Sequence, residues 1–296
     1  MPTEPSPAAM ATAAIPQAMS KATTRYARVL SIAGSDSGGG AGIQADLKTF
    51  AALGCYGMTA ITALTAQNTL GVTGIHGVPA EFLKAQLAAV IEDIGVDAIK
   101  IGMLHAPEIV HVVAWAIDTY RIEKVVLDPV MVATSGDRLI AEETVSVLVK
   151  ELFPRATVIT PNLDEAVLLL GHPIGNAGEL EAAAAELLAM GAPIVLLKGG
   201  HLPGQQVTDV LAQAGTSALR LTSQRIPSEN THGTGCTLSS AIAAHLAQGF
   251  SLPESVARAR AYVLAAIKAG AHVQTGRGHG PLNHGHAPVA TKLLPL

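Results

Sequence analysis

Short apolar runs alternate with segments of helical periodicity from about residue 28 to the end of the chain, and this alternation constrains the fold most. Strands about 30 residues apart with intervening helices predict a mostly parallel sheet between two layers of helices, an α/β fold. The expected strands are 29–33, two within 55–78, 98–102, 125–128, 158–160, 194–198, 207–211 and 219–226. The expected helices are 43–53, 79–94, 107–120, 141–152, 163–170, 179–190, one opening at 233, and 253–273.

The first 26 residues differ from the rest of the chain. They are rich in Ala, Pro, Ser and Thr, and Pro5, Pro7 and Pro16 interrupt any helix. We therefore expect a disordered extension over 1–26, followed by a single domain over 27–296. A secretory signal is not expected, because Lys21 and Arg25 follow the apolar part instead of preceding it; a weak organellar transit peptide is an open alternative.

The composition argues against several classes of function. The 296-residue chain has a formal net charge of −4 and no basic patch interleaved with aromatic residues, so nucleic-acid binding is not expected. Two cysteines, Cys55 and Cys236, are too few for a disulfide framework and indicate a reducing compartment, so we expect a cytoplasmic protein. No stretch suits a membrane-spanning helix, and no cysteine or histidine spacing matches a zinc site.

Polar residues stand at or just after the ends of several expected strands. They are Asp128, Asn162, Lys198 and the turn 233–236. Ligands of parallel sheets bind beyond the carboxyl ends of the strands. We therefore expect these residues to share one rim and to form a functional site there.

The turn over 230–237 is the strongest single signal, because Gly233 and Gly235 precede an apolar run at helical spacing. The first N–H groups of a helix lack intrahelical partners and lie at the positive end of its dipole, so they bind anions. Cys236 stands at the helix entry, where a thiolate is stabilised. The alternative is an ordinary glycine turn capped by Thr234, with Cys236 as a small buried residue.

Two further strand ends each have two interpretations. Asn162 and Glu165 fit a helix capping box, or an N-x-x-E element near a hydrated Mg²⁺ and nucleotide phosphates. Lys198, followed by two glycines, could meet a phosphate or be a solvated lysine at a turn.

The glycine loop at 34–42 matches neither the dinucleotide-binding nor the P-loop pattern. The histidines of 276–286 are expected to be solvated or locally hydrogen-bonded and not to hold a metal.

With these pieces in order, the chain resembles the hydroxymethylpyrimidine/phosphomethylpyrimidine kinases of the ribokinase-like superfamily. Seven motifs carry the resemblance: IAGSDSGGGAGIQADLKT at 32–49, TALTAQNT at 62–69, KIGML at 100–104, LDPVM at 127–131, TPN at 160–162, KGGH at 198–201 and NTHGTGCTLS at 230–239. The match runs from about residue 28 to 286. It departs at Ser37 and Gly38, where the family often has Pro-Ser.

The resemblance implies ATP- and Mg²⁺-dependent phosphorylation of 4-amino-5-hydroxymethyl-2-methylpyrimidine, and then of its monophosphate to the diphosphate, in thiamine diphosphate biosynthesis. It also implies a three-layer fold with a central sheet of about eight strands and, commonly, a homodimer. By motif position, the residues implied in the pyrimidine pocket are Gly34, Asp46, Gln67 and Met103.

The remaining motifs imply the phosphate side of the site. The residues implied to face ATP phosphates and Mg²⁺ are Asp128, Asn162, Glu165, Lys198 and Thr231, with Asp128 and Glu165 toward the metal, Glu165 through water. The anion hole would consist of Gly233, Thr234, Gly235 and Cys236. Related sugar kinases carry an aspartate base in this turn, so Cys236 is the expected acceptor of the hydroxyl proton, unless its thiol only packs.

Two other functions are alternatives. A pyridoxal/pyridoxine kinase also phosphorylates a hydroxymethyl-bearing heteroaromatic, and the cysteine-containing motif occurs in some such enzymes. Gln67 and Met103 favour the pyrimidine, and dual use stays open. A catalytically silent binding module would be expected to lack the anion-hole glycines or the pair Asn162 and Glu165, and this chain has them all.

Overall fold

A computed structural model describes residues 22–131 and 140–296. Its main sheet has nine strands in the order β10-β9-β8-β7-β6-β5-β2-β3-β4, one more than the expected eight or so. The six strands from β8 to β3 are parallel, and β9, β10 and β4 are antiparallel additions at the edges. The strands are β2 Arg28–Asp36, β3 Tyr56–Asn68, β4 Gly71–Gly77, β5 Ala98–Ile101, β6 Val125–Leu127, β7 Val158–Ile159, β8 Ile194–Leu197, β9 Gln206–Gln213 and β10 Leu219–Gln224.

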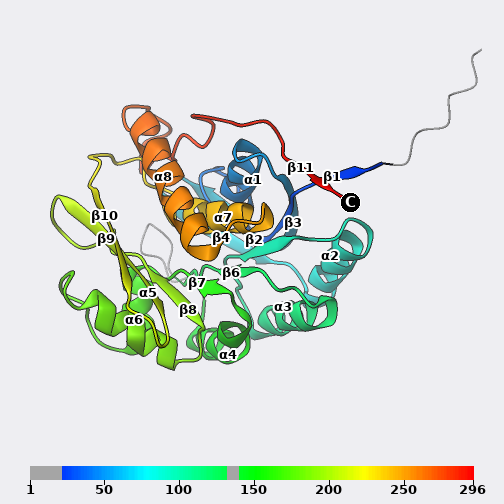
Figure 1. Ribbon diagram of the computed structural model, residues 1–296, viewed down its shortest axis with the longest axis horizontal. Helices are drawn as coiled ribbons and strands as arrows, with labels where there is room; N and C mark the ends of the chain where they lie inside the picture. Colours follow the sequence, from blue (N-terminus) through cyan, green and yellow to red (C-terminus); the bar gives the residue numbers. More distant parts are fainter. Residues whose placement is uncertain (1–21, 132–139) are drawn as a thin grey trace, which may run out of the picture.

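Helices cover both faces of this sheet, so the predicted three-layer α/β fold is confirmed (Figure 1). One apolar core lies between the sheet and α1 Gly42–Ala52, α7 Thr234–Ala247 and α8 Leu252–Gly270. The other lies beneath α2 Ala80–Asp93, α3 Pro107–Tyr120, α4 Glu142–Leu152, α5 Leu163–Leu170 and α6 Leu180–Ala189; a 3-10 turn, η1 Phe153–Arg155, follows α4. Because both faces are covered, central strands such as β6 are apolar throughout and fully buried.

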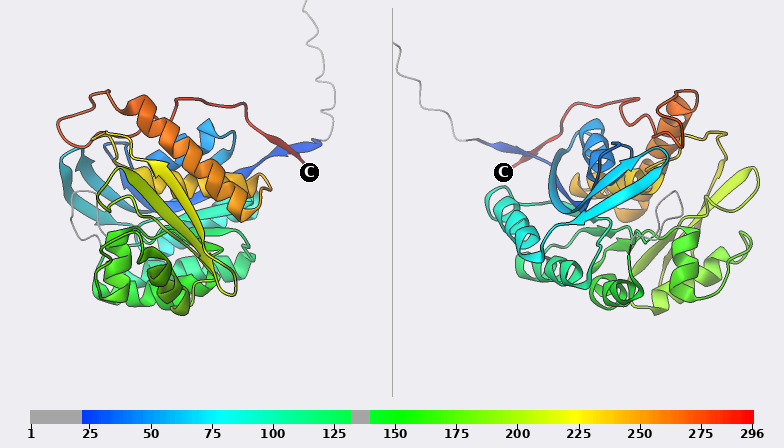
Figure 2. Two further views of the ribbon diagram at one scale, coloured as in Figure 1. Left: turned by 60° about the vertical axis from the view of Figure 1, so that its left-hand side comes forward. Right: turned by 180° about the vertical axis from the view of Figure 1, so that it is seen from behind.

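A second, two-stranded sheet corrects the expected domain boundary. β1 Thr24–Tyr26 pairs antiparallel with β11 Leu293–Pro295, and the two strands lie side by side away from the main sheet (Figure 2). Arg25 forms an ion pair with Asp97 at 2.5 Å. The extension expected over 1–26 therefore does not reach residue 26, because this segment has a partner at the far end of the chain; residues 1–21 lie outside the described part.

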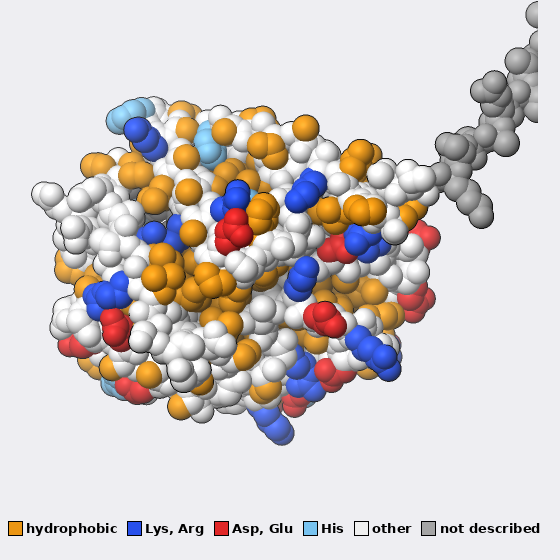
Figure 3. Space-filling model, in the orientation of Figure 1, with side chains coloured by type: hydrophobic (Ala, Val, Ile, Leu, Met, Phe, Trp, Pro, Cys, Tyr) orange, Lys and Arg blue, Asp and Glu red, His pale blue; other side chains and the backbone are white. Residues whose placement is uncertain are grey.

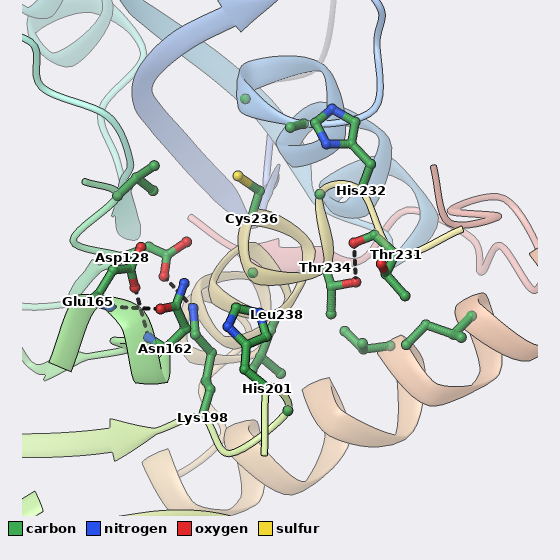
Figure 4. A pocket seen from close by; sticks show the side chains of 18 of the residues that line it. Asp128, Asn162, Glu165, Lys198, His201, Thr231, His232, Thr234, Cys236 and Leu238 are labelled. Carbon is green, nitrogen blue, oxygen red and sulfur yellow. Dashed lines mark hydrogen bonds and ion pairs between the residues drawn. The ribbon is translucent and has the colours of Figure 1, made fainter. Parts of the chain in front are cut away.

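The parallel strands bring their carboxyl ends to one edge, and polar residues follow three of them. Asp128 comes directly after β6, Asn162 precedes α5, and Lys198 comes directly after β8. The amino end of α7 lies at the same edge (Figure 4). The sheet topology therefore assembles the rim that the strand-end pattern predicted.

Two surface findings complete the description. Within residues 22–131 and 140–296, no helix has both the length and the apolar character to cross a bilayer. On the face shown in Figure 3, basic and acidic side chains are interspersed instead of gathering by sign.

Candidate active site

A cavity of about 730 Å³ opens at the carboxyl edge of the sheet. Twelve of the thirteen residues expected in the site line it: Gly34, Gln67, Met103, Asp128, Asn162, Glu165, Lys198, Thr231, Gly233, Thr234, Gly235 and Cys236. Beyond the α7 turn, its wall includes apolar residues of α8 and the segment after β10. One continuous cavity thus reaches from the glycine loop after β2 to the outer strands.

Asp128 and Lys198 form a buried pair at the cavity floor. Lys198 Nζ lies 2.8 Å from Asp128 Oδ1, and the Thr160 hydroxyl donates to the same oxygen at 2.8 Å. Burial acts to raise the pKa of Asp128, but the charges of Lys198 and Lys100 and these hydrogen bonds outweigh it and hold the pKa below its usual value. Lys198 is therefore not the solvated lysine of the alternative interpretation.

Asn162 and Glu165 form the predicted capping box at the start of α5. Asn162 Oδ1 accepts the Glu165 N–H at 2.9 Å, and Glu165 Oε2 accepts the Asn162 N–H at 2.7 Å. Burial, reinforced by the nearby charge of Asp128, raises the pKa of Glu165 to about 8 despite the opposing charge of Lys198. A protonated carboxyl beside a carboxylate is a place where a cation can replace the proton.

The α7 turn begins at a glycine with a positive φ angle. Gly233 is the N-cap residue with φ 82°, and a Cβ there would overlap the Gly40 carbonyl, so the position requires glycine. Gly233 has no side chain with which to cap α7, and the Thr234 hydroxyl donates back to the Thr231 carbonyl at 2.6 Å. The interpretation of Thr234 as a cap is therefore wrong. The Thr234 N–H also donates to the Thr231 carbonyl, at 3.2 Å, so the next N–H groups of α7, those of Gly235 and Cys236, are the candidates for binding an anion.

Cys236 lies at this helix entry, but its thiol is not acidic. Burial raises the pKa of Cys236 to about 11, although the Lys100 ammonium and the Gly42 N–H act in the opposite direction. The expectation of a stabilised thiolate is therefore wrong. Loss of solvation, reinforced by the charges of Asp46 and Asp128, outweighs the favourable contacts of the thiolate at this position.

Asp46 is the expected substrate residue that the structure places elsewhere. Its side chain is fully buried beneath the floor and does not line the cavity. It accepts hydrogen bonds from Ser31 at 2.5 Å and Ser240 at 2.6 Å, and Lys100 Nζ lies 3.0 Å from both of its oxygens. Asp46 therefore acts as the counterion of Lys100, because its position on α1 points it at the sheet and α7.

Several cavity residues were absent from the sequence-based set. Lys100 is fully buried in the otherwise apolar strand β5. A lysine within an apolar run is the sequence feature that could have identified it as a site residue. Asp209 accepts the Gly199 N–H at 2.9 Å and pairs with Arg260 of α8 at 2.7 Å. This pair connects the turn after Lys198 to α8. Local sequence patterns do not predict it, because Gly199, Asp209 and Arg260 belong to three separate segments of the chain.

Comparison with known proteins agrees with this arrangement. A family model described as phosphomethylpyrimidine kinase matches residues 36–283. The hydroxymethylpyrimidine/phosphomethylpyrimidine kinase of Rhizobium meliloti (strain 1021) is 52% identical over 258 residues, which cover 87% of this chain and 96% of the relative.

Solved structures of a phosphomethylpyrimidine kinase and of a pyridoxal kinase are also similar to this chain. A phosphomethylpyrimidine kinase from Clostridium difficile 630 has 42% identity and a TM-score of 0.71, covering 81% of this chain and 99% of its own. An ADP complex of Bacillus subtilis pyridoxal kinase has 39% identity and a TM-score of 0.81, covering 88% and 98%. The chain is therefore a kinase and belongs to the phosphomethylpyrimidine kinase family.

Proposed function

We propose that this kinase transfers the γ-phosphoryl group of ATP to the hydroxymethyl oxygen of 4-amino-5-hydroxymethyl-2-methylpyrimidine, and then phosphorylates the resulting monophosphate. The observation that carries this proposal is one continuous cavity, which Gly34, Gln67 and Met103 line together with the α7 turn. An acceptor held at the first group and a phosphate held by the second would share this cavity. ATP use is also supported by the ADP bound to the related B. subtilis pyridoxal kinase.

The acceptor end suits a small heteroaromatic ring. A Cβ at Gly34 would lie 2.8 Å from Met103 Cε, so glycine lets the methionine pack against the backbone here, and both residues line the cavity. The Gln67 amide can donate and accept at once, as the edge of an aminopyrimidine requires. Beyond the turn, Val263, Leu264 and Ile267 of α8 offer an apolar wall for the base of the nucleotide.

Phosphoryl transfer requires positioning and neutralisation of charge more than covalent participation. Lys198 and the α7 amides, with Gly233, Thr234 and Gly235 forming the turn, would hold the phosphates, and Thr231 and Asn162 border the same space. The oxygen donors Asp128 and Glu165 fit Mg²⁺, which prefers carboxylates, phosphate oxygens and water. When bound, Mg²⁺ would neutralise charge on the transferring group.

Cys236 is the proposed acceptor of the hydroxyl proton. As the acceptor oxygen bonds to phosphorus and the bond to the ADP oxygen breaks, the hydroxyl proton has to leave, and the Cys236 sulfur would take it. With a pKa of about 11, the reactive thiolate is a minor species at neutral pH, so the rate of this step has to rise with pH. The anion hole would supply the rest of the catalysis.

Direct kinetics test the proposal. We expect wild-type protein with ATP and Mg²⁺ to form first the pyrimidine monophosphate and then the diphosphate, with ADP released in each step. Absence of both products, with the chain folded, would refute it. Pyridoxal is the second candidate acceptor because of the similarity to the B. subtilis pyridoxal kinase, and side-by-side kcat/KM values for the two acceptors decide between them.

Two further expectations belong to this proposal. Both cysteines are free thiols, which supports the proposed cytoplasmic location. The proposed homodimer rests on the family resemblance alone, and light scattering of the purified protein measures it.

A further inference from the structure

His232 joins two parts of the acceptor end that are far apart in the sequence. Its Nε2 lies 2.9 Å from Asp36 Oδ2 and 3.4 Å from the side-chain nitrogen of Gln67. Its side chain is 11% exposed, and a Cβ at Gly40 would overlap its ring. Figure 4 shows the imidazole on the side of the α7 turn away from Asp128 and Glu165.

The chemistry of Asp36 determines which way the first contact runs. Its carboxylate accepts the N–H groups of Gly38 at 2.8 Å, Gly40 at 3.1 Å and Ala41 at 2.8 Å. Burial acts to raise the pKa of Asp36, but the hydrogen bonds from His232 and from these backbone groups outweigh it and lower the pKa. An ionised carboxylate only accepts, so Nε2 of His232 carries a proton and donates.

That proton in turn determines the orientation of the Gln67 amide. A donating Nε2 cannot face an amide nitrogen, which also donates, so the amide oxygen must face the imidazole. Rotating the Gln67 amide by a half turn exchanges the positions of its oxygen and nitrogen. The amide nitrogen then lies 3.0 Å from Thr65 Oγ1, where the oxygen was before. The Thr65 hydroxyl donates to the Ser35 carbonyl at 3.0 Å, and its oxygen can therefore accept from Gln67. In this orientation the Nε2 proton, which Asp36 holds at 2.9 Å, also faces the amide oxygen, and the amide nitrogen has Thr65 Oγ1 as an acceptor.

We propose that His232 is a positioning residue that fixes the side-chain amide of Gln67, so that the acceptor end prefers an aminopyrimidine over a hydroxypyridine. An amide in fixed orientation offers one N–H and one oxygen lone pair in a set order. A 4-aminopyrimidine edge, with an amino N–H beside a ring nitrogen, complements that order. A 3-hydroxypyridine such as pyridoxal lacks the amino donor. A Gln67 amide that rotates freely therefore binds pyridoxal as well as a fixed amide does. This inference rests on the proposed function.

The test measures the ratio of kcat/KM for the hydroxymethylpyrimidine to kcat/KM for pyridoxal. We expect His232→Leu to lower this ratio at least tenfold while the KM for ATP stays within twofold. His232→Gln, whose amide N–H can replace the Nε2 proton, should restore most of the ratio. The control is His279→Leu, an exposed histidine near the same turn whose side chain contacts the Glu229 carbonyl, and it should leave the ratio unchanged.

A second comparison isolates the route through Gln67. Residues that act through one another are not additive, so His232→Leu should not lower the ratio further in a Gln67→Leu background. A further fall there would overturn the inference. If His232→Leu fails to fold, His232→Asn decides instead, since its shorter amide cannot reach Gln67 and its ratio must fall.

The outcomes separate the two proposals. An equal loss for both acceptors in His232→Leu, or an unchanged ratio, overturns the positioning role while the wild-type activity still supports the proposed function. A wild-type chain that does not phosphorylate the pyrimidine overturns the proposed function and this inference together.

Discussion

The substitution Asp46→Asn tests whether the pair of Asp46 and Lys100 holds the fold or binds the substrate. Both side chains are fully buried, and Lys100 Nζ lies 3.0 Å from Asp46 Oδ2. Asparagine keeps the shape of the carboxylate but leaves the Lys100 charge without its counterion. Removing one partner of a buried ion pair costs about 3–5 kcal/mol. We expect the free energy of unfolding to fall by that amount.

The same loss has a thermal equivalent. In a domain of this size each kcal/mol shifts Tm by about 2–4 °C, so Tm should fall by roughly 6–20 °C. Urea unfolding followed by circular dichroism gives the free energy, and a thermal scan gives Tm. The matched control is Asp118→Asn, which breaks a pair with Arg155 on a side chain that is 56% exposed. Exposed pairs contribute about 0.2–1 kcal/mol, so the control should stay near wild type.

Kinetics complete this test. Below its Tm, Asp46→Asn should keep a pyrimidine KM within about threefold of wild type, because Asp46 does not line the cavity. If Asp46→Asn is as stable as Asp118→Asn but has a strongly raised pyrimidine KM, the reasoning is refuted and Asp46 is a residue of the substrate pocket.

Four further predictions follow from the site and the chain ends. Gln67→Leu should lower kcat/KM for the pyrimidine by about 5- to 150-fold, equivalent to 1–3 kcal/mol, with little change in the KM for ATP; unchanged pyrimidine kinetics would remove Gln67 from the pocket. Cys236→Ala should lower kcat by about 10²-fold or more, and wild-type log kcat should rise by about one per pH unit below the pKa of about 11; a flat profile with an active alanine variant would leave the thiol as packing. Glu165 binds its proton more tightly when folded (pKa about 8) than when unfolded (about 4.3), so stability should fall as pH rises through that interval, and the Tm of Glu165→Gln should lack this fall. Deleting 1–21 should leave Tm and kcat/KM unchanged, whereas deleting 1–26 removes β1 and should lower Tm; equal Tm values would show that the β1–β11 pairing adds nothing.

Periodicity in the sequence predicted the main elements well. The helices expected at 107–120 and 163–170 have those bounds in the structure, because each has a clear apolar stripe and a recognisable start. The three-residue strands β1 and β11 were not predicted. Such strands are too short for a period, and their pairing joins the two ends of the chain, which no local pattern records.

The sequence predicted the positions of site residues better than their ionisation. Asp128, Asn162 and Lys198 follow from strand order, because parallel strands end at one edge. Ionisation depends on burial, which only the packed structure determines. The helix-entry pattern around Cys236 therefore predicted the turn correctly and the acidity of the thiol wrongly. The prediction that Asp46 lies in the pyrimidine pocket was wrong for a related reason, since the rotation of α1 about its axis decides which of its residues face the cavity.

The charges at the cavity floor are paired within the protein, and this pairing has a consequence for ligand binding. Asp46 offsets Lys100, Asp128 offsets Lys198, and Glu165, with its pKa of about 8, is largely protonated at neutral pH. A phosphate that takes hydrogen bonds from Lys198 leaves Asp128 without its cation. A divalent cation restores that balance, and it also favours loss of the Glu165 proton. Nucleotide and Mg²⁺ should therefore each strengthen binding of the other, and binding of Mg²⁺ should tighten as pH rises toward 8.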